Sequence, residues 1–131
     1  MSFYTASVTL TKKKMLVSEL ITLPFNPQRE AIWDDNRRVS YIRSVLHNYH
    51  QQGGDFTLSE TGILDGEQRL STLKRFVDSV LSPEVLATLR LLPFNQMSID
   101  AQTRFLHRKI TVIYQHLSMV RRNPRRECRN R

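Results

Sequence analysis

The chain has 131 residues, of which 40% are hydrophobic and 24% charged, and it carries a formal net charge of +8. Its length fits one small domain with its own core and excludes a second catalytic domain. The single cysteine, Cys128, excludes an internal disulfide and a paired-cysteine metal or redox site. Because the sequence shows neither a signal peptide nor an apolar run of transmembrane length, it predicts a soluble, cytoplasmic protein without a membrane partner.

The first 30 residues predict short elements. Residues 3–10 alternate loosely between apolar and polar types and predict an edge strand, which would also suit a homodimer. Residues 15–21 fit a short helix and a strand equally well. Pro24 and Pro27 then indicate an extended chain over residues 23–28, since proline disfavours helix at the residue before it.

A longer helix is predicted after the only tryptophan. Asp34-Asp35-Asn36 is typical of a helix start, because such side chains cap the first turn. The apolar residues that follow share one helical face: Val39, Ile42, Val45, Leu46 and Tyr49. Gly53-Gly54 predicts that the helix ends near Gln52. His47 and His50 lie three residues apart, as a metal pair or as surface histidines that suit the helix dipole, and no third ligand is evident.

The middle of the chain predicts two short strands and a helix around a glycine turn. Residues 56–58 and 63–64 have strand composition, and residues 59–62 between them form a turn. The second strand runs into Asp65-Gly66, after which apolar residues recur at helical spacing: Leu70, Leu73, Phe76, Val77, Val80 and Leu81. A helix that begins after a glycine turn can receive an anion at its N-terminus.

The residue types of that turn allow two interpretations. In the functional one, Arg69 adds a fork of donors for a phosphate, while Asp65 and Glu67 hold a metal ion or orient a water molecule. In the structural one, Asp65-Gly66 is only a turn, with Asp65 as the helix cap and Arg69 paired with a carboxylate at the edge of the core.

The last third predicts two helices and a strand. Ser82-Pro83-Glu84 combines a capping serine with proline at the first helical position, and it predicts a helix that ends before Pro93. Ser98-Ile99-Asp100 predicts a short helix through Leu106. Residues 109–114 are rich in β-branched types and predict a buried strand. Together these elements indicate an α+β fold, a small mixed sheet with packed helices, in a single domain over residues 1–120.

A basic tail is predicted over residues 121–131. It holds six arginines and one glutamate, and so carries +5 of the net charge of +8. Four of the arginines, Arg121, Arg122, Arg125 and Arg126, are candidate nucleic-acid contacts, because arginine clusters add salt-dependent affinity for DNA or RNA. The alternative is a disordered, solvated end that keeps the protein soluble.

Two separated segments resemble a known family. Gln28-Arg29-Glu30-Ala31-Ile32-Trp33 is similar to its Q-R-x-x-x-W signature, and Asp65-Gly66-Glu67-Gln68-Arg69-Leu70-Ser71-Thr72-Leu73 to its D-G-Q-Q-R-L-T-T-L signature. They are the signatures of the GmrSD-type restriction-system N-terminal domain, in the ParB/sulfiredoxin-like superfamily. The order of the motifs, the helix between them and the strand at 109–114 also agree, so that the resemblance covers roughly residues 15–115.

The resemblance implies a ParB/sulfiredoxin-like fold that binds and hydrolyses a nucleoside triphosphate with Mg²⁺ during attack on modified foreign DNA. The matching positions are Gln28, Arg29 and Trp33 in the first motif and Asp65, Gly66, Gln68 and Arg69 in the second. Glu67 departs from the family glutamine, and its negative charge beside a phosphate opposes nucleotide binding unless a metal ion or Arg29 offsets it. A C-terminal nuclease domain, common in the family, does not fit in this length, and cleavage of DNA by this chain alone is not expected.

Three hypotheses follow. The first is a compact nucleotide-binding domain with weak phosphohydrolase activity, in which Asp65 and Glu67 are catalytic and hold Mg²⁺. The second is a non-catalytic module that docks on DNA, RNA or a protein and acts as a decoy or regulator of a larger restriction-type system. The third is the purely structural motif described above.

Overall fold

The computed structural model describes residues 4–24, 33–47 and 56–121, and confirms an α+β fold with a four-stranded mixed sheet. The predictions for Gln28, Arg29, His50, Arg122, Arg125 and Arg126 lie outside these residues. In chain order the elements are β1 Tyr4–Leu16, α1 Val17–Leu20, α2 Asp35–Leu46, β2 Phe56–Ser59, β3 Gly62–Asp65, α3 Glu67–Val77, α4 Pro83–Thr88, the 3-10 turn η2 Phe94–Gln96, α5 Ile99–Leu106 and β4 Lys109–Arg121.

The sheet has the strand order β1-β4-β2-β3. β1 and β4 pair antiparallel over their full 13 residues, from Tyr4 opposite Arg121 to Leu16 opposite Lys109. β2 runs parallel to β4 and forms a tight antiparallel hairpin with β3. β1 therefore lies at an edge of the sheet, as the sequence predicts, although it extends six residues beyond the predicted end at residue 10.

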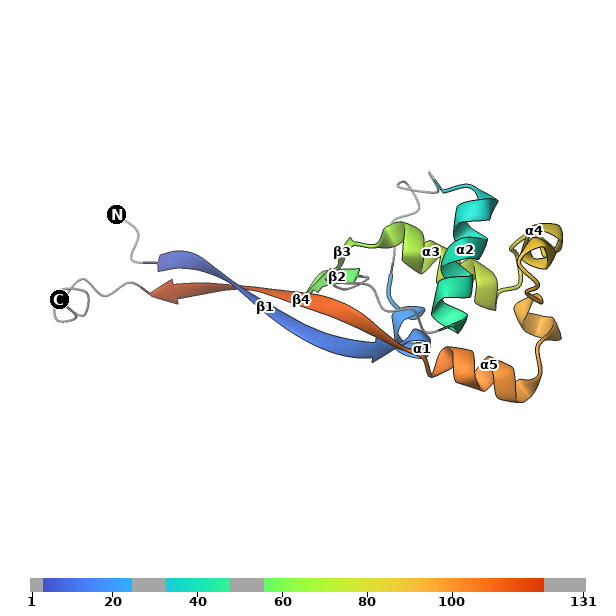
Figure 1. The fold of residues 1–131 in the computed structure, drawn as a ribbon. Coiled ribbons are helices and arrows are strands. Elements are labelled where there is room, and N and C mark those ends of the chain that lie inside the picture. Colours follow the sequence, from blue (N-terminus) through green and yellow to red (C-terminus); the bar gives the residue numbers. More distant parts are fainter. Residues whose placement is uncertain (1–3, 25–32, 48–55, 122–131) are drawn as a thin grey trace.

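A long two-stranded ribbon projects from the helical body. β2 pairs with β4 only at Val112, Ile113 and Tyr114, so beyond Tyr114 only β1 accompanies β4. Figure 1 shows β1 and β4 running side by side away from the helices. The sequence predicts a strand only over residues 109–114, whereas β4 continues to Arg121, the first residue of the predicted tail.

The helices pack on one face of the sheet at its body end. This face carries Phe56 and Leu58 of β2 and Ile110 and Val112 of β4, each at most 4% exposed. Against them lie buried side chains of the helices, among them Val39, Ile42, Leu70, Leu73, Phe76 and Phe105. Phe76, Phe94 and Phe105 form an aromatic cluster with ring centroids 5.0–6.0 Å apart, which ties α3, η2 and α5 into one core.

The predicted serine cap of α4 is confirmed, and the predicted helix after Ser98 also begins with a serine cap. Ser82 Oγ accepts a hydrogen bond from the Val85 amide at 3.4 Å, and Ser98 Oγ accepts one from the Ala101 amide at 3.1 Å. Each bond satisfies an N–H group that has no partner inside its helix. α4 ends at Thr88, five residues before Pro93, and α5 ends at Leu106 as predicted.

The predicted end of α2 is wrong. The helix stops at Leu46 rather than near Gln52, and His47 is its C-terminal cap residue. Arg108 Nη2 donates a hydrogen bond to the Leu46 carbonyl at 2.8 Å, and so satisfies one of the oxygens that a helix end exposes. This contact links α2 to the residue before β4, and a local glycine signal cannot reveal it.

No helix within the described residues is both long enough and apolar enough to cross a membrane. The longest, α2, has 12 residues, whereas a span of the hydrocarbon core takes about 20.

Candidate functional site

The second motif begins at the junction of β3 and α3. Asp65 is the last residue of β3 and pairs with Thr57 of β2, and its side chain is exposed. Gly66 follows with φ +107° and ψ 15°, and α3 starts at Glu67. Because a residue with a Cβ rarely adopts this backbone conformation, glycine allows the abrupt passage from strand to helix. Within the structural interpretation, the assignment of Asp65 as the helix cap is wrong, because the cap residue is Gly66.

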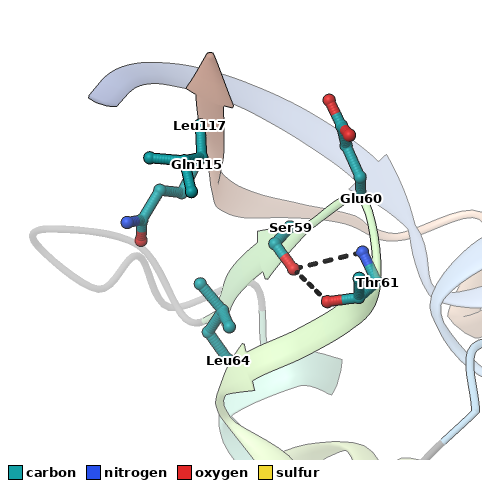
Figure 2. A pocket seen from close by; sticks show the side chains of 6 residues that line it. All are labelled: Ser59, Glu60, Thr61, Leu64, Gln115 and Leu117. Carbon is teal, nitrogen blue, oxygen red and sulfur yellow. Dashed lines mark hydrogen bonds between the residues drawn. The ribbon is translucent and has the colours of Figure 1, made fainter. Parts of the chain in front are cut away.

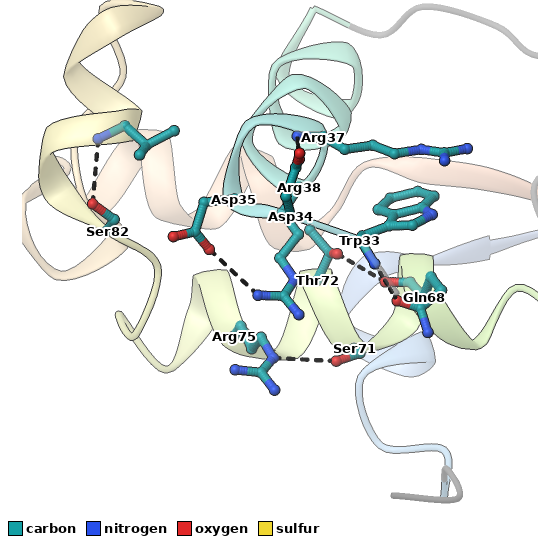
Figure 3. Close-up of polar contacts among 11 residues, drawn as sticks. Trp33, Asp34, Asp35, Arg37, Arg38, Gln68, Ser71, Thr72, Arg75 and Ser82 are labelled. Atoms are coloured by element: carbon teal, nitrogen blue, oxygen red, sulfur yellow. Dashed lines mark hydrogen bonds and ion pairs between the residues drawn. The ribbon is translucent and has the colours of Figure 1, made fainter. Parts of the chain in front are cut away.

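A hydrogen bond joins the two motifs across 35 residues of sequence. The backbone amide of Trp33 donates to Gln68 Oε1 at 3.3 Å, as Figure 3 shows. The backbone carbonyl of Gln68 also accepts from Thr72 Oγ1, one turn later on α3, at 2.8 Å. Gln68 therefore serves as a contact between the segment before α2 and the first turn of α3.

A second hydrogen bond connects α3 to the chain on the other side of the first motif, before residue 28. Lys74 Nζ, on α3, donates to the carbonyl of Leu23 at 2.6 Å. Burial lowers the pKa of the Lys74 ammonium, and the attraction of the Asp78 carboxylate opposes that change. Leu23 precedes and Trp33 follows the segment with Gln28 and Arg29, so both flanks of this segment contact α3.

Trp33 lies in an aromatic and cationic setting that the sequence did not indicate. Its ring meets the Tyr41 ring edge to face at a centroid distance of 5.9 Å. The guanidinium carbon of Arg37 lies 4.7 Å from the Trp33 ring centroid, a cation–π contact (Figure 3). Arg37 follows Trp33 by four residues, which is the only sequence signal that could have selected it.

Five predicted site residues thus lie at consecutive positions of one strand–helix junction: Asp65, Gly66, Glu67, Gln68 and Arg69. The last four are partly buried. Of the predicted tail contacts, Arg121 is the last residue of β4.

The carboxylates of the junction are suited to a hard cation. Asp65 and Glu67 flank Gly66, and Mg²⁺ prefers one or two carboxylates completed by water and phosphate oxygens. Within the described residues no group of three or more His, Cys, Asp or Glu side chains converges. A divalent ion held by Asp65 and Glu67 would therefore take its other oxygen ligands from a bound phosphate and from water.

Comparisons with protein-family models, curated proteins and solved structures found no match to this chain. The family resemblance rests on the two motifs quoted above.

Proposed function

We propose that the chain is a nucleotide-binding domain of the ParB/sulfiredoxin-like kind, similar to the GmrSD-type N-terminal domain, that acts in DNA processing or restriction. The observation that supports this proposal is the attachment of both flanks of the upstream segment to α3, through Gln68 and Lys74. Arg29 lies four residues before Trp33 in the sequence, in the segment between these two attachments.

Each motif residue then has a role. The Gly66 backbone and the Arg69 guanidinium hold phosphate oxygens, since a glycine allows close approach and arginine offers paired donors. Gln28 and Gln68 orient the nucleotide, and Arg29 provides a second phosphate contact. Asp65 and Glu67 bind Mg²⁺, which when bound supplies positive charge to the phosphates, and either carboxylate can orient a water molecule for slow hydrolysis.

The proposal is tested by calorimetry of the full chain with each of the four ribonucleoside triphosphates and Mg²⁺. At least one should release heat, and Arg69→Ala should abolish this heat without changing the circular dichroism spectrum. Arg75→Ala is the matched control, because Arg75 lies on the same helix but two residues beyond the motif, where it donates from Nε to Ser71 Oγ at 3.3 Å. Absence of heat with all four nucleotides would contradict the proposal.

A second candidate function, a non-catalytic binding module or regulator of a larger restriction-type system, is favoured by the arginines of residues 121–131. Deletion of residues 122–131 removes five of these six arginines and should weaken DNA or RNA binding in a gel-shift series at increasing salt. Unchanged affinity after the deletion would remove the tail from any nucleic-acid site.

A further inference from the structure

The net positive charge of the chain is confined to the ribbon and the tail that follows it. Residues 4–16 and 109–131 contain ten of the 20 lysines and arginines and one of the 12 acidic residues, for a net charge of +9. The rest of the chain has ten basic and eleven acidic residues, for a net charge of −1. Neither β1 nor β4 contains an aspartate or glutamate. The ribbon itself is therefore a basic element, separate from the nearly neutral helical body.

Three lysines share one face of this ribbon. Lys12 is opposite Ile113, Lys14 opposite Thr111, and Lys109 opposite Leu16. Since directly opposed residues of antiparallel strands point to the same side and side chains alternate along a strand, the three lysines lie on the face that does not carry Ile110 and Val112. We call this the outer face, with the residues Val8, Leu10, Lys12, Lys14, Lys109, Thr111, Ile113, Gln115 and Leu117. All three lysines are exposed.

Lys13 provides an internal contrast. It is opposite the fully buried Val112, so it lies on the helix-covered side of the sheet. Its Nζ lies 4.6 Å from the centroid of the Tyr114 ring. Lys13 has the same charge and sits in the same strand as Lys12 and Lys14, but it points to the other face.

Toward the tip, the outer face becomes apolar and includes an open pocket. Val8, Leu10 and Leu117 are 54–63% exposed. Beside them lies a pocket of about 360 Å³, lined by Ser59, Glu60, Thr61, Leu64, Gln115 and Leu117 (Figure 2).

The polar groups that line the pocket come from β4 and from the β2–β3 hairpin. Figure 2 shows Gln115 facing it from β4, while Ser59 Oγ bonds Thr61 Oγ1 at 2.8 Å within the β2–β3 turn. The one carboxylate there, Glu60, has an oxygen 3.7 Å from His116 Nδ1. The outer face thus offers lysines at the body end, and an amide among apolar side chains toward the tip.

We propose that the outer face of the β1–β4 ribbon binds nucleic acid, with Lys12, Lys14 and Lys109 on backbone phosphates and the Leu10, Gln115 and Leu117 region against sugars and base edges. A two-stranded ribbon has the width that the major groove of duplex DNA admits, and a glutamine amide can pair with a base edge. β4 ends at Arg121, and five more arginines follow it in the sequence. This surface is separate from the β3–α3 junction and does not depend on nucleotide binding there.

Charge complementarity favours this partner over a second copy of the chain. Two outer faces in contact would bring six lysines together without a single acidic residue from β1 or β4 to offset them. An anionic lipid surface would accept the lysines and the leucines, but it gives no base-edge partner to Gln115.

The test measures binding of the full-length protein by fluorescence anisotropy over a salt series. Three probes are compared: a 20-base-pair DNA duplex, the corresponding RNA duplex and a single strand. The triple variant Lys12→Gln/Lys14→Gln/Lys109→Gln should bind the preferred nucleic acid about tenfold more weakly or worse, and its log–log salt slope on DNA should fall by about 3, close to 0.9 for each lost phosphate contact. The triple lysine-to-arginine variant should retain binding. Lys13→Gln should change the slope by less than one third of that amount.

Each other outcome overturns the proposal. Unchanged affinity of the triple glutamine variant would assign binding to the tail or the body. If Lys13→Gln reduces affinity as much as each outer-face lysine does, then binding depends on net charge and not on the outer face. If the wild-type protein binds none of the three nucleic acids but does bind vesicles containing phosphatidylserine, the partner of the outer face is a membrane surface and not a nucleic acid. Thermal melts confirm that the variants fold, as expected for substitutions of exposed side chains.

Discussion

Phe105→Ala should lower the free energy of unfolding by about 3–5 kcal/mol, the range for loss of a large buried aromatic side chain. Phe105 is 1% exposed, and its ring centroid lies 5.0 Å from that of Phe76 and 6.0 Å from that of Phe94. The substitution leaves a cavity and removes two aromatic contacts that connect α5 to α3 and η2. Urea denaturation followed by circular dichroism measures the change.

The matched control lies on the same helix. Ile99 is the first residue of α5 and is 80% exposed, so Ile99→Ala should change the free energy of unfolding by no more than about 0.5 kcal/mol. Since a domain of this size has about 5–15 kcal/mol of stability in total, Phe105→Ala should leave a folded protein only if the wild type is not at the low end. A loss below about 1 kcal/mol would contradict the role of this aromatic cluster as the centre of the core.

The elements predicted correctly are those with a local signal. Ser82 and Ser98 each precede a run at helical spacing, and both act as caps because the hydrogen bond they make spans only three residues. The hairpin of β2 and β3 follows likewise from two short apolar runs around a Gly-containing turn. Residues 15–21, which fit helix and strand equally, contain both: β1 ends at Leu16, and α1 begins at Val17.

What the sequence did not indicate depends on distant contacts. The outer half of β4 contains the polar residues Gln115, His116 and Ser118, and so lacks a buried-strand pattern. This agrees with its position, since none of the helices that the structure describes covers that part of the ribbon. Only pairing with β1, about 110 residues away, makes it a strand. In the same way, the motif residues were predicted as two sets, but the Trp33–Gln68 and Leu23–Lys74 hydrogen bonds are tertiary and could not be inferred from spacing.

Gly66→Ala should have two separable effects. The first is a loss of about 1–2 kcal/mol in the free energy of unfolding, because the Cβ is strained at a φ of +107°. The second is a loss of nucleotide affinity of about tenfold or more, equivalent to about 1.4 kcal/mol, because a Cβ would enter the space through which a phosphate approaches the backbone. Urea denaturation gives the first quantity, and nucleotide calorimetry gives the second.

Gly62→Ala separates backbone strain from loss of the site. Gly62 has a φ of +125°, and an added Cβ there would meet no atom within 4 Å, so its cost comes from the backbone alone. Both variants should therefore lose similar stability, whereas only Gly66→Ala should lose nucleotide affinity. Equal affinity in the two variants would mean that Gly66 serves only to turn the chain from β3 into α3, and that the phosphate contacts assigned to this junction lie elsewhere. A selective loss would place the phosphate next to the Gly66 backbone, at the strand–helix junction that carries Gln68 and Arg69.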